Sequence, residues 1–126
     1  MDTPVQPVKN EHRAHPVASA WRPTFRSIVK TFASGDYSLR APVPGVRVDA
    51  STAAQIEAYL SDYGETLDEL PDDTWDTSVS QWMGRHWDVL VDLWTVESGE
   101  SDLVLAARVL PKEDGYSIEV GGVYVP

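Results

Sequence analysis

The chain has 126 residues, of which 42% are hydrophobic and none is cysteine, and its formal net charge at pH 7 is −10. This length and composition predict one globular domain with its own core. The lack of cysteine excludes disulfides, thiol catalysis and thiolate metal sites. No apolar run approaches the ~20 residues that span a membrane, and the polar N-terminus has no apolar signal-peptide segment, so we expect a cytoplasmic protein.

Charge is unevenly distributed along the chain. Residues 1–47 carry seven Lys or Arg against three Asp or Glu, whereas residues 48–84 carry nine acids and no Lys or Arg. Residues 85–126 carry eight acids against three Lys or Arg. A field of this sign repels nucleic acid and anionic lipid, so we expect neither as a partner, and it attracts a basic protein. The alternative is that the acids only keep a small domain soluble.

The first part of the chain predicts an arm and then a helix. Residues 1–17 are polar and contain three prolines, so we expect a flexible N-terminal arm ahead of a single domain over residues 18–126. From Ala20, apolar side chains recur at helical spacing until Gly35, which suits a left-handed helix cap. The opposite helix face carries a basic row: Arg22, Arg26 and Lys30. Such a row binds a phosphate or an acidic partner, or it pairs with the protein's own acids.

A second helix is predicted after a loop over residues 37–50. The loop contains two prolines, and a short edge strand within it is an open alternative. Thr52 and Gln55 have the spacing of a capping box, which predicts the start of the helix at Thr52. Gly64 is expected to end it.

An acidic centre follows the second helix. A calcium loop of the EF-hand type starting at Asp72 needs Asp or Asn at its third position, glycine at its sixth and glutamate at its twelfth, where this chain has Thr74, Thr77 and Met83. We therefore expect no metal site and instead a loop that faces a partner, or a helix start at Asp72, Asp73 and Thr74. The candidate partner-binding residues of this loop are Asp68, Glu69, Asp72, Asp73 and Asp76.

The last third predicts a sheet. Residues 75–84 fit both the helical and the strand period, and we expect a short helix there. Strands are expected over residues 87–97, 102–110 and 116–125, and their short connections make neighbours antiparallel. Gly121 and Gly122 suggest a bulge or a close backbone approach. The predicted fold is α+β, with two N-terminal helices packed on a three-stranded antiparallel β-meander in two layers, and an extra short helix or edge strand is left open.

No catalytic motif is recognised, so we expect a non-enzymatic protein with no catalytic residue and no cofactor. Asp88 and Asp92 share a strand face but lie about 13 Å apart, too far for an acid/base pair on one bond, and Arg108 is placed for a cross-strand ion pair. His86 is interpreted as a structural histidine at a strand end. Trp94 lies on the face of the two aspartates, and this mixture of apolar and acidic groups suits a protein-binding surface.

Three segments carry a resemblance: HWDVLVDLWTVESGESDLVL, VGGVYVP and WRPTFRSIVKTFASGDY. They resemble a family of small bacterial proteins of unknown function, notably from proteobacteria. The resemblance covers most of the chain after residue 15 and implies no activity. As a small, acidic, cysteine-free α+β protein with exposed tryptophan, the chain is also loosely similar to the immunity proteins that neutralise toxins of competing bacteria, although it shares no motif with them.

These observations predict a protein-binding module of the immunity-inhibitor kind. Its acidic loop and a sheet face formed by Asp88, Asp92 and Trp94 are expected to bind a basic partner. One alternative is a small-molecule-binding or hydrolytic domain with a helix-sheet cleft around His86. The other is a homodimer built through the sheet.

Overall fold

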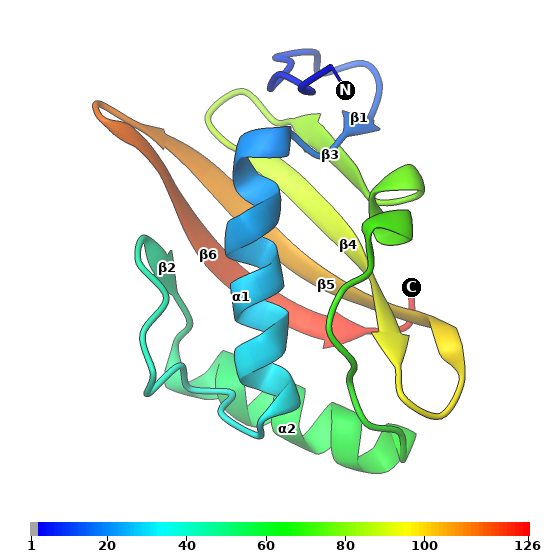
Figure 1. Ribbon diagram of the computed structural model, residues 1–126. Coiled ribbons are helices and arrows are strands. Elements are labelled where there is room, and N and C mark those ends of the chain that lie inside the picture. The colour runs from blue at the N-terminus through cyan, green and yellow to red at the C-terminus, as the bar shows by residue number, and fades with distance from the viewer. Residues whose placement is uncertain (1–2) are drawn as a thin grey trace.

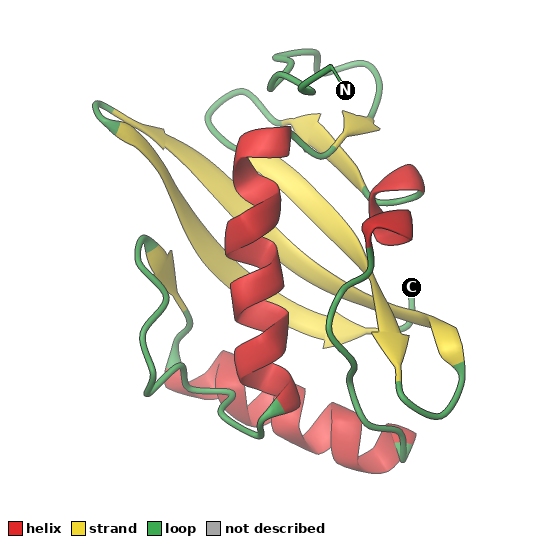
Figure 2. Ribbon diagram, viewed as in Figure 1, coloured by secondary structure: helices red, strands yellow, loops and turns green. Residues whose placement is uncertain are grey.

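The computed structural model describes residues 3–126 as an α+β fold in which helices pack on a six-stranded sheet. The elements in chain order are β1 (His15–Pro16), η1 (Ser19–Trp21), α1 (Arg22–Ala33), β2 (Val46–Arg47), α2 (Ala50–Tyr63), η2 (Asp72–Asp76), β3 (Val79–Trp82), β4 (Trp87–Thr95), β5 (Gly99–Lys112) and β6 (Gly115–Tyr124), where η denotes a 3-10 helix. The strand order is β1-β3-β4-β5-β6-β2, and only the β2–β6 pairing is parallel. Helix α1 lies across one face of the sheet, and α2 crosses its lower end (Figure 1, Figure 2).

The predicted meander is present as β4, β5 and β6, but three strands undercount the sheet. Strand β3 pairs with the first half of β4, and the two-residue strands β1 and β2 form the edges. The edge strand left open for residues 37–50 is β2. The short helix predicted over residues 75–84 is wrong, because this segment leaves η2 and enters β3, where pairing with β4 decides between the two periods.

Local chemistry fixes where the helices begin and end. Pro23 occupies the first turn of α1, and Gly35 follows it with a φ of 90°. Helix α2 is capped by Asp49 and not by Thr52, because the Asp49 carboxylate accepts the Thr52 N–H at 2.8 Å. Gly64 ends α2 in the left-handed region, as predicted.

The core fills the layer between α1 and the sheet. Every odd position of β4 from Trp87 to Thr95 is buried, whereas the even positions are exposed or partly exposed. Four side chains of α1 are buried in the same core: Phe25, Ile28, Val29 and Phe32. Burying side chains of this size contributes about 1.5–3 kcal/mol each. Within residues 3–126, no helix is long and apolar enough to cross a membrane.

Helix α2 covers the free edge of β6. Gln55 Nε2 donates to the Val123 carbonyl at 2.8 Å, and the Val123 N–H donates to Gln55 Oε1 at 3.3 Å. The Val125 N–H donates to the hydroxyl of Tyr59 at 3.0 Å. These side chains take the place of a neighbouring strand, so this part of the edge is closed to pairing with another chain.

A bulge in β6 confirms the prediction made from its two glycines. The register of β5 with β6 shifts between Ala106 and Ala107, which leaves Gly121 without a partner. Gly122 has a φ of 153°, and a Cβ atom there would lie 2.9 Å from Gln55 Oε1. The backbone conformation therefore favours glycine, and a Cβ atom would displace the Gln55 amide from its hydrogen bonds with Val123.

The N-terminal segment lies against the β3 side of the sheet. His15 pairs with Ser80 across the β1–β3 ladder, and Val17 and Ala18 are fully buried. Residues 1 and 2 of the predicted flexible arm lie outside the described residues.

Candidate functional site

The sheet face opposite α1 is called the open face below. In β4 it presents Asp88, Leu90, Asp92 and Trp94, of which Asp88 is exposed and the others are partly exposed. The strand registers place further side chains on this face: Val79, Gln81, Val104, Ala106, Arg108, Glu119 and Tyr124. Three of the predicted site residues, Asp88, Asp92 and Trp94, therefore share one surface.

A row of polar and charged side chains crosses the open face. Gln81, Asp88, Arg108, Glu119 and Arg47 lie in register on β3, β4, β5, β6 and β2. The Arg47 guanidinium lies 3.8 Å from the Glu119 carboxylate. Acid and base alternate along the row, which is a favourable cross-strand arrangement. Arg108 faces Asp88 in register, as the predicted cross-strand pair requires.

His86 and Asp88 form a hydrogen-bonded pair at the edge of the open face. The distance from His86 Nε2 to Asp88 Oδ1 is 2.9 Å, and the two side chains are 23% and 52% exposed. This pair therefore sits on the surface, where the carboxylate orients the imidazole. The cleft that was predicted as an alternative would lie between the helices and the sheet, and buried core side chains fill that layer.

An apolar band runs beside the charged row. Leu90, Trp94, Ala106 and Tyr124 are partly exposed, and Val104 is only 4% exposed although it does not belong to the core cluster. The indole N–H of Trp94 is buried and has no acceptor. The open face thus carries a small apolar cluster of its own, distinct from the core under α1.

Asp92 is held in place by η2 and the residues after it. The Thr77 hydroxyl donates to Asp92 Oδ2 at 2.5 Å. The Asp92 N–H donates to Ser78 Oγ at 2.9 Å, and the Asp92 carbonyl accepts the hydroxyl of Thr74. These hydroxyls take the place of a strand partner on the edge of β4 that faces away from β5. On that edge β3 pairs only as far as Leu90, and the next backbone partner, Asp68, bonds to Trp94.

The segment that pairs with β4 at Trp94 and Thr95 brings one acidic-loop residue, Asp68, to the open face. The Asp68 N–H donates to the Trp94 carbonyl at 2.9 Å, and the adjacent Leu67 forms a bridge with Thr95. Because Leu67 is buried on the α1 side and side chains alternate along an extended segment, Asp68 borders the open face.

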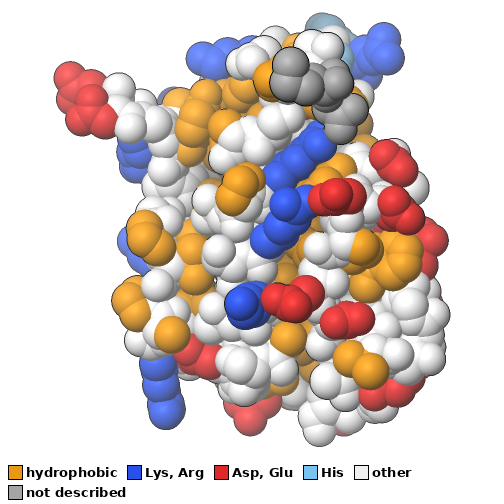
Figure 3. Space-filling model, viewed as in Figure 1, with side chains coloured by type: hydrophobic (Ala, Val, Ile, Leu, Met, Phe, Trp, Pro, Cys, Tyr) orange, Lys and Arg blue, Asp and Glu red, His pale blue; other side chains and the backbone are white. Residues whose placement is uncertain are grey.

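Other acids of the loop lie on the α1 side. Asp72 forms an ion pair with Arg26, and Glu69 Oε1 lies 3.8 Å from Lys30 Nζ. Figure 3 shows this basic row on α1 next to acidic side chains. The interpretation that the basic row pairs with the protein's own acids is confirmed for these two pairs. The acidic loop and the open face are therefore not one continuous acidic surface.

Asp73 and Asp76 are exposed in η2, beside this ion-paired row. Among residues 3–126, no group of three or more His, Cys, Asp or Glu side chains is placed to hold a metal ion. Arg22 and Arg26 lie over the ring of Trp75, with centroid distances of 5.4 and 5.9 Å. These contacts use the basic row to join α1 to η2.

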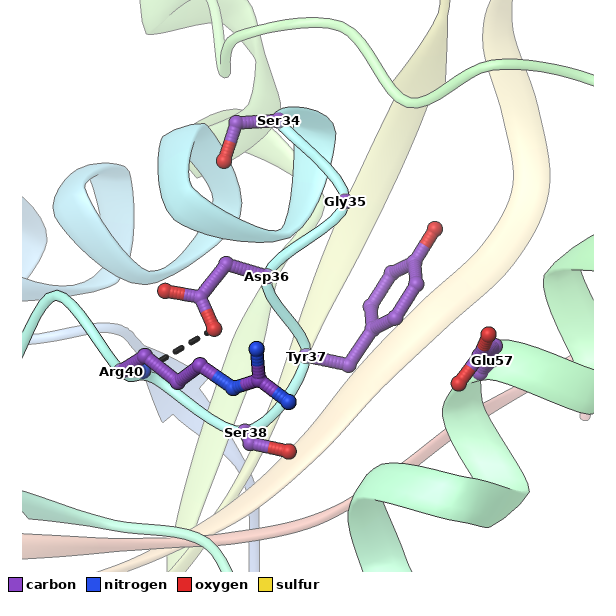
Figure 4. Close-up of a pocket in the computed structure, with 7 residues that line it drawn as sticks. All are labelled: Ser34, Gly35, Asp36, Tyr37, Ser38, Arg40 and Glu57. Atoms are coloured by element: carbon purple, nitrogen blue, oxygen red, sulfur yellow. Dashed lines mark hydrogen bonds between the residues drawn. The ribbon is translucent and has the colours of Figure 1, made fainter.

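A hollow of about 370 Å³ opens between the turn after α1 and α2 (Figure 4). It is lined by Ser34, Gly35, Asp36, Tyr37, Ser38, Arg40 and Glu57. The Asp36 carboxylate accepts the backbone N–H groups of Ala41 and Arg40, and these bonds lower the pKa of Asp36 below its ordinary value. Asp36 is therefore held ionised and shapes the turn.

Tyr124 and Val104 were missed as members of the surface. Tyr124 has the sequence phase of Ile118 and Val120, whose side chains are buried under α1, but the bulge at Gly121 moves Tyr124 to the other face. Glycine pairs in a strand are the signal for such a change of phase.

Comparison with known proteins gives one family. The model for a domain of unknown function, DUF7668, matches residues 29–126. No curated protein and no solved structure matches the chain.

Proposed function

The chain belongs to the DUF7668 family, and we propose that this member is a non-enzymatic module that binds a basic partner protein through its open face. The observation that carries the proposal is the juxtaposition on that face of partly exposed apolar side chains with acids. Leu90, Trp94 and Tyr124 supply apolar contact area, and Asp88 and Asp92 lie on the same strand as the first two.

The composition of this face suits a binding hot spot. A tryptophan surrounded by other apolar side chains is the kind of residue that carries most of the energy of a protein interface. The buried indole N–H of Trp94 has no acceptor, so a partner that opens this cluster and offers a carbonyl gains a hydrogen bond. Asp92 is already fixed by Thr77, which lowers the cost of ordering it on binding.

The charge of the chain favours a basic partner. The net charge is −10, and Asp68, Asp88 and Asp92 border or occupy the open face. Opposite charges across an interface accelerate association and reject partners of the wrong sign.

An inhibitor of the immunity type is one role that fits such a surface. An acidic, partly apolar face placed over a basic active site would block access of a negatively charged substrate to that site. This finer assignment rests on the same surface and is tested by the identity of the partner.

The experiment is affinity capture with the full chain from a lysate of the source cells, at low and high salt, with bound proteins identified by mass spectrometry. We expect one basic protein, retained at low salt and weakened at high salt. Capture of no protein, or of an acidic one, would contradict the proposal.

A matched pair of variants locates the contact. Asp88→Asn and Glu57→Gln each remove one negative charge, but Glu57 is exposed on α2, away from the open face. Asp88→Asn should reduce the amount of partner captured, whereas Glu57→Gln should not. Equal effects of the two variants would mean that the acids act only through the overall negative charge of the protein, and would refute a contact at the open face.

A further inference from the structure

Four aromatic side chains gather at the end of the sheet next to the N-terminus of α1. Trp87 lies at the centre, with ring centroids 5.0 Å from Trp21, 4.6 Å from Trp82 and 6.0 Å from Tyr116. Trp21 and Tyr116 are 5.4 Å apart in an edge-to-face arrangement. The cluster lies on the α1 side of the sheet, so it is separate from the open face.

Residues 3–11, called the strap below, lie over this cluster. The indole N–H of Trp87 donates to the Val8 carbonyl at 3.0 Å. Lys9 Nζ lies 4.9 Å from the centroid of the Trp82 ring, in the geometry of a cation–π contact. The strap therefore presents a backbone acceptor to one tryptophan and a cation to the next.

Hydrogen bonds from the rest of the domain hold both ends of the strap. The Val5 N–H donates to Ser19 Oγ at 2.7 Å, and the Ser19 N–H donates to the Val5 carbonyl at 2.9 Å. Gln81 Nε2 donates to the Glu11 carbonyl at 2.8 Å. Most of these contacts are hydrogen bonds to backbone groups of the strap, so any extended peptide of the same shape could form them.

The strap has the composition of a peptide that aromatic grooves recognise. Its sequence TPVQPVKNE contains Pro4 and Pro7 three residues apart, followed by Lys9. Proline-containing extended segments lose little entropy on binding and dock in aromatic-lined grooves. The strap does not fully cover this end of the molecule, because Val8, Met83 and Tyr116 remain 39%, 51% and 43% exposed. Figure 3 shows hydrophobic side chains at the surface here, beside the N-terminal segment.

The strap and most of its floor come from different parts of the chain. The family match covers residues 29–126 and contains Gln81, Trp82, Trp87 and Tyr116, whereas the strap lies before the matched region. Most of the floor thus lies within the matched region, and the strap that covers it lies before that region.

We propose that this aromatic groove is a second peptide-binding site, occupied by the strap in cis and open in trans to an extended proline-containing segment of a partner that carries a lysine. The groove uses the Trp87 indole N–H, the Trp82 ring and the Gln81 amide to recognise two carbonyls and a cation. The strap and the partner segment compete for the same groove. The apparent affinity of the groove for the partner is therefore reduced in proportion to the fraction of time that the strap leaves it free.

The test uses the full chain and a synthetic TPVQPVKNE peptide, with binding followed by tryptophan fluorescence. The double variant Pro7→Ala and Lys9→Glu loosens the strap and leaves unchanged the groups that would hold the peptide, Ser19 included. If the strap is closed about nine-tenths of the time, the peptide should bind the double variant about tenfold more tightly than the wild type. Equal affinity for the two proteins, or no binding to either, would overturn the proposal.

Two controls assign the binding to the groove. In the loosened background, Gln81→Ala and Trp82→Leu should each weaken binding of the peptide, and circular dichroism verifies that each variant is folded. If Trp82→Leu does not fold, a peptide with its lysine replaced by glutamate decides, because it should bind more weakly once the contact with the Trp82 ring is lost, and equal binding would overturn the proposal. A peptide with both prolines replaced by alanine should bind more weakly, and equal binding would overturn the proposal. A wild-type dimer that the double variant dissociates would assign the groove to the strap of a second copy and would also overturn it.

Discussion

Ser78 supports the strand that carries the candidate site, and its replacement by alanine should destabilise the protein by about 2 kcal/mol. The side chain is 2% exposed and its Oγ accepts the Asp92 N–H at 2.9 Å, on the side of β4 where Asp92 has no partner from β3. Ser78→Ala leaves this buried donor without an acceptor, and such a loss costs ~1–3 kcal/mol. For a domain of this length, we expect a fall in Tm of about 6–8 °C.

The assay compares Ser78→Ala with a matched control. Ser27→Ala removes a serine hydroxyl as well, but this hydroxyl lies on the exposed face of α1 and donates to the Pro23 carbonyl. The control should lie within about 0.5 kcal/mol of the wild type, because alanine is a good helix former. Urea unfolding gives both free energies, and amide hydrogen exchange at Asp92 should accelerate only in Ser78→Ala. Equal stability of the two variants, with an unchanged Asp92 exchange rate, would refute the role given to Ser78.

Three further changes test other parts of the fold. Tyr63 donates its hydroxyl to the Asp102 carboxylate at 2.6 Å, which raises the pKa of Tyr63 to about 12, so the stability that this bond supplies is present below pH 10 and is lost as the pH rises through 12. Tyr63→Phe should remove that part of the pH dependence and the highest-pH step of the phenolate absorbance titration, and an unchanged titration would contradict the assignment. Gly122→Ala should cost about 1–3 kcal/mol in urea unfolding, because it strains a φ of 153° and drives a Cβ against Gln55; a cost below 0.5 kcal/mol would show that α2 is not held so closely. Asp49→Ala should lower Tm at neutral pH, because it removes the cap of α2. Backbone hydrogen bonding lowers the pKa of Asp49 below 3.8, so the difference in Tm from the wild type should vanish as the pH falls through that lowered pKa. A difference in Tm that persists in strong acid would contradict the cap.

The long central strands could be predicted from the sequence because their patterns are strong and their connections short. Strand β4 alternates between buried and exposed positions over nine residues, and this one strand defines the open face with Asp88 and Trp94. Short segments gave no such signal. Strand β3 has four residues and β1 and β2 have two each, so their strand conformation comes from the neighbour they pair with.

Two features at the level of single residues were not predicted, for clear physical reasons. Thr52 has the spacing of a capping residue, but Asp49 lies three positions earlier and its carboxylate takes the Thr52 N–H. The role of the acidic loop in binding a partner stays a prediction, and the sequence does not show that Glu69 and Asp72 lie next to the basic row of α1 and pair with it. Contacts between segments about 40 residues apart in the chain depend on how α1 sits on the sheet, which the sequence pattern does not contain.

The affinity of the captured basic partner for Trp94→Ala tests the proposed open-face interface most directly. Val8→Ala is the matched control, because Val8 is an exposed apolar side chain whose backbone contacts Trp87 on the α1 side of the sheet, away from the open face. If Trp94 is the hot spot, its truncation should weaken binding about thirtyfold, while Val8→Ala should leave the affinity unchanged. A folded Trp94→Ala variant that binds the partner as tightly as the wild type would contradict the assignment of the open face as the binding surface.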